Sequence, residues 1–180
     1  MTLLYLLDQD DDSGRWAPFL GARPIAELRA GAWRIRERWE RALGIPAAVI
    51  LSNRVSGYHE LDEPAVRPIG PIRGPAVIAR SDFAPADGPA PRDAELRRLT
   101  AAGRVVAWLV PDGGVWSGPA ADGPAAEIAG VEIDGTFGLI TALEQLLPGD
   151  CAAFGIGTGD PLPAGSTVLG NPDGVILRGA

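Results

Sequence analysis

The sequence has one cysteine, one histidine and no lysine. Cys151 has no partner within the chain, so no intrachain disulfide can form and a reducing compartment is expected. No apolar run approaches the roughly 18 residues of a membrane-spanning helix. The first seven residues, MTLLYLL, lack the basic start of a signal peptide. These absences together predict a soluble, cytoplasmic protein.

The charge balance is acidic, although every basic residue is an arginine. The 16 basic residues are outnumbered by 23 acidic ones, which gives a net charge of −7. This balance argues against nucleic acid or an anionic membrane as the main partner. An anionic nucleotide would need a local basic site built from arginine alone. At 180 residues and 46% hydrophobic content, the chain can bury the core of one domain.

Four short, continuously apolar runs are typical of strands that are buried on both faces of a parallel sheet: residues 3–7, 47–51, 76–79 and 105–110. Because they alternate with helical or irregular segments, we expect an α/β fold with a mostly parallel, Rossmann-like sheet. The Pro-Asp-Gly-Gly turn at residues 111–114 predicts an edge hairpin that returns through Val115 and Trp116. Residues 131–133 are a further candidate edge strand.

Three segments have helical character. Residues 23–43 repeat apolar side chains at intervals of three and four, which is the spacing of one helical face, and Gly44 marks the stop. A short helix is expected over residues 94–102. The last helix is expected over residues 137–147, with its leucine and isoleucine side chains facing inward and its end at Pro148.

The loop after the first strand carries four aspartates, Asp8 and Asp10 to Asp12. Open α/β sheets bind ligands at this end of their strands. A calcium loop counted from Asp8 fails, because Ser13 and Phe19 stand where glycine and a carboxylate are needed. An aspartyl-nucleophile phosphatase lacks convincing downstream partners. Two interpretations stay open: a solvated acidic loop, or Asp8 and Asp10 as ligands of a divalent metal beside a nucleotide.

The first 45 residues also contain a run of motifs: LYLLDQD at residues 4–10, Arg15, a Pro-Phe pair at residues 18–19, GARP at residues 21–24 and AELRAG at residues 26–31. This run resembles the N-terminal domain of a bacterial sugar nucleotidyltransferase family, in which a left-handed β-helix follows. The family is similar to the bifunctional N-acetylglucosamine-1-phosphate uridylyltransferase and glucosamine-1-phosphate acetyltransferase. Beyond residue 45 only the layout is alike.

The resemblance implies a pyrophosphorylase reaction, in which a nucleoside triphosphate and a sugar 1-phosphate give a nucleotide sugar and pyrophosphate. Mg²⁺ is the cofactor that it implies. Arg15 stands where the family has its loop arginine, and Arg23 stands where the family has a lysine beside proline, so both would stabilise phosphates. The family's glycine-rich loop is absent, since this loop has only Gly14 and Gly21.

Polar residues that follow the predicted strands are further site candidates. Ser52, Asn53 and Arg54 come directly after the strand at residues 47–51, where they are placed to contact the base or the sugar. The resemblance makes Asp82 the best single metal candidate, together with the acidic loop. Asp82 departs from the family's pattern, because no glycine precedes it.

Three further observations concern the rest of the chain. His59, the lone histidine, is expected on the surface of an irregular connection. Asp150 follows the last predicted helix, where a turn-stabilising role and a role with metal or substrate both stay open. Residues 1–160 are expected to form the transferase-like domain. Residues 161–180 form a tail whose spaced apolar pairs are typical of a first β-helix turn, so we expect a longer natural protein.

Two functions are therefore weighed. The first is a sugar-1-phosphate nucleotidyltransferase, whose partners are a nucleoside triphosphate and a sugar 1-phosphate. The second is a catalytically degenerate domain that binds a sugar nucleotide or supports oligomerisation, and serves a C-terminal β-helix acyltransferase. The missing glycine-rich loop and lysine favour the second function, whereas the retained Arg-Pro pair is compatible with catalysis. A homo-oligomer assembled through a further C-terminal domain stays open.

Overall fold

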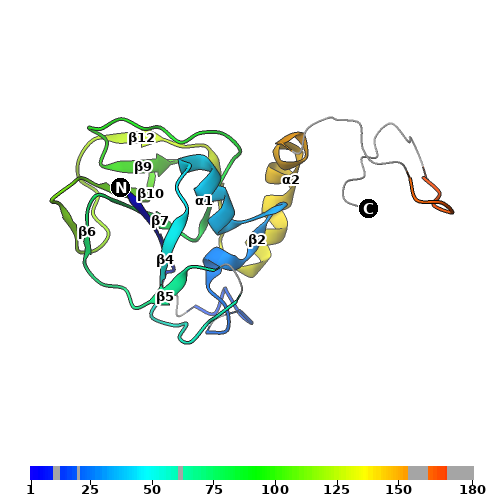
Figure 1. Ribbon diagram of the computed structural model, residues 1–180, viewed down its shortest axis with the longest axis horizontal. Coiled ribbons are helices and arrows are strands. Elements are labelled where there is room, and N and C mark those ends of the chain that lie inside the picture. Colours follow the sequence, from blue (N-terminus) through cyan, green and yellow to red (C-terminus); the bar gives the residue numbers. More distant parts are fainter. Residues whose placement is uncertain (10–12, 20, 61–62, 154–161, 170–180) are drawn as a thin grey trace.

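The computed structural model describes residues 1–9, 13–19, 21–60, 63–153 and 162–169, which form an α/β fold (Figure 1). Seven strands make one sheet in the order β12-β9-β10-β7-β1-β4-β5. In that order they span Ala125–Glu127, Arg98–Ala101, Arg104–Val110, Ala76–Arg80, Leu3–Leu7, Ala47–Leu51 and Ala65–Arg67. Strand β10 is antiparallel to both of its neighbours, and all other pairs are parallel. The expected mostly parallel, Rossmann-like sheet is confirmed.

All four predicted apolar runs become strands of this sheet, namely β1, β4, β7 and β10. They are apolar throughout because both faces of the sheet are covered. On one face, Leu4 and Leu6 pack in a cluster with residues of helix α1, which spans Ile35–Leu43. On the other face, Leu7 packs in a second cluster that includes Trp108 and Trp116.

The segment before α1 is not helical, so the prediction of a helical face over residues 23–43 is wrong in its first half. A 3₁₀ turn η1 at Ile25–Glu27 leads into a hairpin of β2 (Arg29–Ala30) and β3 (Trp33–Arg34). Gly31 turns this hairpin with a φ of +74°, which lies in the left-handed region. Helix α1 does end at Gly44 as predicted, with φ of 58°.

Two predictions in the second half of the chain are wrong. Strand β9 occupies residues 98–101 of the segment expected as a helix at residues 94–102, because it pairs with both β10 and β12. Strand β11 (Val115–Trp116) pairs with β6 (Ile72–Arg73) and not with β10, so the turn at residues 111–114 does not close a two-stranded hairpin. The candidate strand near residue 131 is confirmed as β13 (Gly130–Glu132), which pairs with β8 (Phe83–Pro85).

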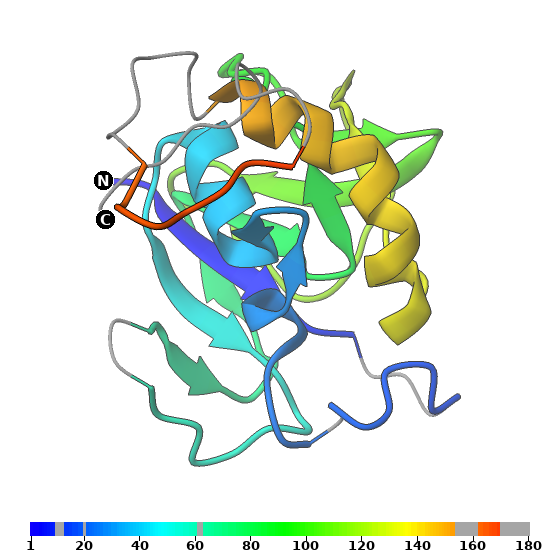
Figure 2. The same cartoon turned by 90° about the vertical axis from the view of Figure 1, so that its right-hand side faces the viewer.

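Helix α2 spans Thr136–Ala153 and runs through Pro148, where its end was predicted. It continues because Asp150, beyond the proline, is held in a buried ion pair by Arg38 of α1. Helix α2 lies at the side of the molecule, next to β2 (Figures 1 and 2). The prediction of an inward-facing apolar side is wrong for several residues, since Ile140, Leu143 and Leu147 are exposed. Its buried side chains are Ala142, Leu146 and Asp150.

Among the described residues, none of the helices combines the length and apolarity that crossing a lipid bilayer requires. The predicted β-helix turn falls mainly on residues 170–180, and the boundary at residue 160 also falls outside the described residues. Both stay predictions.

Candidate functional site

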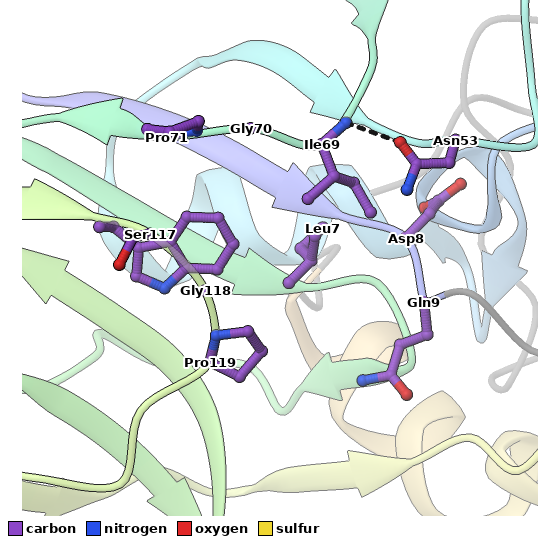
Figure 3. A pocket seen from close by; sticks show the side chains of 11 residues that line it. Leu7, Asp8, Gln9, Asn53, Ile69, Gly70, Pro71, Ser117, Gly118 and Pro119 are labelled. Atoms are coloured by element: carbon purple, nitrogen blue, oxygen red, sulfur yellow. Dashed lines mark hydrogen bonds between the residues drawn. The ribbon is translucent and has the colours of Figure 1, made fainter.

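A cleft of about 420 Å³ opens at the carboxyl ends of β1 and β4 (Figure 3). Its lining comes from the ends of these strands and from the loops that follow β5 and β11: Leu7, Asp8, Gln9, Asn53, Ile69, Gly70, Pro71, Trp116, Ser117, Gly118 and Pro119. Parallel strands end here together, which is where open α/β sheets bind ligands. The volume is within the range of small-molecule sites.

One side of the cleft is apolar. Leu7, Ile69, Pro71 and Pro119 line it together with Trp116, whose ring lies 6.0 Å from the ring of Trp108. The indole nitrogen of Trp116 is buried and has no hydrogen-bond partner in the part of the chain that the structure describes. A buried donor without an acceptor carries a free-energy cost that a ligand acceptor would relieve.

The polar side of the cleft is built on Asp8, the first residue after β1. The backbone N–H groups of Ile25 and Ala26 donate to its two oxygens, at 3.0 and 3.4 Å. Burial raises the pKa of Asp8 to about 6, against the opposing effect of the hydrogen bonds from Ile25 and Ala26. Asp8 therefore anchors the start of η1 and titrates close to neutral pH.

Asn53 and Gln9 extend this polar side (Figure 3). The Asn53 side-chain oxygen accepts a hydrogen bond from the backbone N–H of Ile69 at 3.0 Å, which ties the loop after β5 to the end of β4. Gln9 also lines the cleft. The cleft therefore offers carboxylate, amide and hydroxyl groups opposite an apolar wall.

A second, smaller hollow shares Asp8 and Gln9 with the cleft. Its other lining residues are Gly21, Arg23, Ile25, Ser52, Arg54 and Val55, and its volume of about 10 Å³ has room for one water-sized molecule. Arg23 forms an ion pair with Glu60 and lies 5.8 Å from the ring of Tyr58. This pairing raises the pKa of Arg23 and lowers that of Glu60.

The structure thus brings five of the predicted site residues together around the two hollows: Asp8, Arg23, Ser52, Asn53 and Arg54. Arg15 lies elsewhere. It forms an ion pair with Asp134, and its carbonyl accepts a hydrogen bond from the N–H of Thr136 at 2.9 Å. Arg15 is therefore attached to the start of α2, and it lines neither hollow.

Asp82 lies beyond the end of β7 and is held by two arginines. Its oxygens accept hydrogen bonds from Nε and Nη2 of Arg80, at 2.9 and 2.6 Å, and from Nη2 of Arg104 at 3.0 Å. Burial raises the pKa of Asp82, and the neighbouring Arg80 opposes this shift. Because both oxygens already face cations, this carboxylate is poorly suited to bind a metal cation.

Asp8 is better suited to magnesium than Asp82. Among the described residues, no three histidine, cysteine, aspartate or glutamate side chains lie together as a ready-made metal site. Mg²⁺ in nucleotide enzymes is commonly held by one or two carboxylates together with the substrate's phosphates, and Asp8 can supply one such carboxylate. The predicted ligand Asp10 lies outside the described residues.

Sequence reasoning missed the apolar wall, including Ile69, Trp116 and Pro119. The available signal was the presence of large apolar side chains inside segments rich in glycine and proline. Their meeting depends on the pairing of β6 with β11, which joins segments about 40 residues apart. Local patterns carry no information about that pairing.

The sequence model of a family described as sugar nucleotidyl transferase matches residues 4–65, about a third of the chain. The matched segment contains β1, α1 and β4, and it ends at the start of β5. Every residue that lines the smaller hollow lies within it. No curated protein matches the sequence. The match supports a relationship to sugar nucleotidyltransferases at the level of the family.

Proposed function

We propose that this chain is a sugar-1-phosphate nucleotidyltransferase, which uses a nucleoside triphosphate and a sugar 1-phosphate and releases pyrophosphate. One observation carries the proposal: the cleft and the smaller hollow meet at Asp8 and Gln9, at the carboxyl end of β1 and inside the segment that matches the family. The cleft would take the nucleoside, and the arginines beside it would take the phosphates.

The chemistry of the cleft suits a nucleoside. A flat base would pack against the apolar side formed by Leu7, Ile69 and Trp116. The amide of Gln9 and the hydroxyl of Ser117 offer donors and acceptors for the base edge or the ribose. The buried indole N–H of Trp116 would gain an acceptor if a ligand oxygen comes within reach.

Phosphate binding would require a change at Arg23. The smaller hollow is too small for a phosphate group as it stands. A phosphate would therefore displace Glu60 and bind the Arg23 guanidinium through two parallel hydrogen bonds, with Arg54 on the same hollow. Arg15 would contribute only after leaving Asp134.

Catalysis would then depend on positioning and charge neutralisation. A phosphate oxygen of the sugar 1-phosphate attacks the α-phosphorus in line, and the bond to the β-phosphate breaks as pyrophosphate leaves. Arg23 and Arg54 would stabilise the negative charge that develops on the leaving group. Asp8 would hold Mg²⁺, which would supply further charge neutralisation when bound.

The test is a matrix of reactions with five nucleoside triphosphates and several sugar 1-phosphates, each with magnesium and with EDTA. Product nucleotide sugar is measured by chromatography. We expect one base to give product, and we expect Arg23→Gln to lower kcat about a hundredfold or more without lowering the unfolding temperature appreciably. Arg41→Gln is the matched control, because Arg41 is also paired with a carboxylate, that of Asp87, but lies on α1. Absence of product from every pair would contradict the proposal.

A degenerate binding domain is the second candidate, and a specific observation favours it. Arg15 and Arg23 are each paired with a carboxylate, and Asp82 is held by two arginines, so several candidate groups already have partners. This function predicts that a nucleotide sugar raises the unfolding temperature while no pair of substrates gives product. Product formation would exclude it.

A further inference from the structure

A third hollow, of about 220 Å³, lies beside the cleft and is lined by two arginines. Arg80 is the last residue of β7 and Arg104 is the first residue of β10. These strands are antiparallel neighbours with Ala79 opposite Ala107, so the end of one meets the start of the other. Arg80 alternates with Ile78 and Ala76 and therefore lies on the sheet face that carries the two tryptophans.

We propose that Arg80 and Arg104, with Asp82 between them, form an anion site that binds a phosphate or pyrophosphate group without a metal ion. The site does not depend on the transferase reaction proposed above. Its basis is the arrangement of the two guanidinium groups around one carboxylate and one hollow.

Arg80 is a buried cation with an unused donor. Arg80 is 9% exposed, and Asp82 accepts hydrogen bonds from its Nε and Nη2. Its third nitrogen, Nη1, has no acceptor within the described ranges of the chain, although the side chain lines the hollow. The bidentate contact with Asp82 fixes the plane of the guanidinium, so the remaining donor is held in place before any ligand arrives.

Arg104 supplies a second cation that is easier to reach. Its Nη2 donates to Asp82 at 3.0 Å, and it also pairs with Glu132. The Glu132 side chain is 51% exposed, so water competes for this pair and an incoming phosphate can replace the carboxylate. One buried carboxylate is thus shared by two arginines, so one positive charge is left for an anion once Glu132 is displaced.

The neighbours of the hollow fit a phosphorylated ligand. Trp108 and Pro119 line it with the two arginines, and Pro119 also lines the large cleft. A ligand seated in the cleft could therefore extend an anionic group toward Arg80. The positive charges of the two guanidinium groups would repel a metal cation near Asp82. The same charges would attract and neutralise a phosphate group.

The experiment is a titration of the full chain with inorganic pyrophosphate in EDTA, read by tryptophan fluorescence and by calorimetry. Trp108 lines the hollow and contacts Trp116, so binding should change the emission. We expect saturable binding that Arg104→Gln weakens about tenfold or more. Arg41→Gln is the matched control, because its side chain is 41% exposed against 36% for Arg104 and it also pairs with an aspartate.

Two further variants separate the alternatives. Asp82→Asn removes the carboxylate that competes for the two arginines, so pyrophosphate should bind at least as tightly in EDTA as it does to the unaltered chain. If Asp82 is instead a metal ligand, binding would require magnesium and Asp82→Asn would abolish it, which overturns the proposal. Arg23→Gln, which should disable the proposed transferase, should leave the part of this binding that depends on Arg104 unchanged, because the hollow beside Arg23 has no room for a phosphate group while Glu60 is paired there. Binding that Arg104→Gln leaves intact would also overturn the anion site.

Discussion

Arg38 and Asp150 form an ion pair that is buried on both sides, with 2% and 1% of the two side chains exposed. The Asp150 carboxylate also accepts a hydrogen bond from the N–H of Ala32 at 2.7 Å. Arg38 donates to the carbonyl oxygens of Ala30 and Pro85, at 2.6 and 3.2 Å. This pair therefore fastens α2 to α1 and to the hairpin of β2 and β3.

Removing one partner of this pair should destabilise the protein strongly. Asp150→Ala leaves the Arg38 charge buried without a counterion, and we expect the free energy of unfolding to fall by about 3 to 5 kcal/mol. Urea denaturation followed by circular dichroism measures it. Glu144→Ala, an exposed position on the same helix, is the control and should change little. A loss below about 1 kcal/mol for Asp150→Ala would show that the pair does not hold α2 in place.

Gly31 faces the same pair, and alanine should not be tolerated there. A Cβ at Gly31 would overlap the Asp150 carboxylate and the Arg38 guanidinium, and φ of +74° adds backbone strain. Gly103→Ala is a matched control, because its φ is +78° but nothing lies within 4 Å of its added Cβ. We expect Gly31→Ala to lower the unfolding midpoint clearly more than Gly103→Ala, which carries only about 1 kcal/mol of strain. Equal losses in the unfolding midpoint would mean that Arg38 and Asp150 can move aside for the added methyl group at little cost.

The two sides of α2 should respond differently to truncation. Leu146 is 3% exposed and packs in the main core, whereas Phe137 is 82% exposed. Leu146→Ala should cost about 2 to 5 kcal/mol of the free energy of unfolding. Phe137→Ala should change it by less than about 0.5 kcal/mol. Denaturant titrations of both variants test this difference, and a large loss for Phe137→Ala would show that its ring is covered in solution.

Glu63 should make stability depend on pH in the neutral range. Burial, followed by the nearby charge of Glu27, raises the pKa of Glu63 to about 7. Its Oε2 is buried without a hydrogen-bond partner among the described residues, while Oε1 accepts from Tyr58 at 3.0 Å. A carboxyl whose pKa is higher in the folded state contributes stability that is complete below its unfolded pKa and is lost as the pH rises through the folded one.

The unaltered chain should therefore lose stability relative to Glu63→Gln as the pH rises from 5 to 8. The difference should change most steeply below pH 7, where the folded-state carboxyl is still protonated and the unfolded-state one is not, and it should level off above pH 7. Urea midpoints measured for both proteins at several pH values give this comparison. Parallel curves across the whole range would contradict a raised pKa at this position.

Glu60 should restrain phosphate binding at Arg23. Glu60→Gln removes the charge that pairs with the Arg23 guanidinium, so the dissociation constant for the nucleoside triphosphate should fall about two- to fivefold. Calorimetry of both proteins at low salt measures the change. A weaker affinity in the variant would indicate that Glu60 positions Arg23 for the ligand instead of competing with it.

The predictable parts of the fold are those in which local pattern and burial agree. Residues 3–7 and 76–79 are apolar because the sheet buries both of their faces, and both runs appear in strands. Strand β9 was not predictable, because the spacing of Leu96 and Leu99 favours a helix. Its strand conformation depends on pairing with β10 and β12. Likewise, the turn at Gly31 is stabilised by Asp150, which lies more than a hundred residues away.

The candidate site divides in the same way. Asp8 and Asn53 could be identified because each follows a strand, and the topology then determines which end of the sheet they reach. The pairing of Asp82 with Arg104 could not be identified from the sequence. Arg104 lies on β10, and only the antiparallel pairing of β10 with β7 brings it to Asp82. The environment of a carboxylate, and hence its chemistry, depends on such neighbours.

Strand β1 lies between β4, which belongs to the family-matched segment, and β7, which follows it in the chain. Its hydrogen bonds to β7 join main-chain groups and are therefore indifferent to side-chain identity. The residues after 65 can consequently diverge in sequence while still completing the same sheet. A fragment that ends at residue 65 would keep the whole segment that the family model matches. It would lack β7, so one edge of β1 would be exposed and the fragment would be prone to aggregate. The segment that the family model matches is therefore smaller than the unit that can fold on its own.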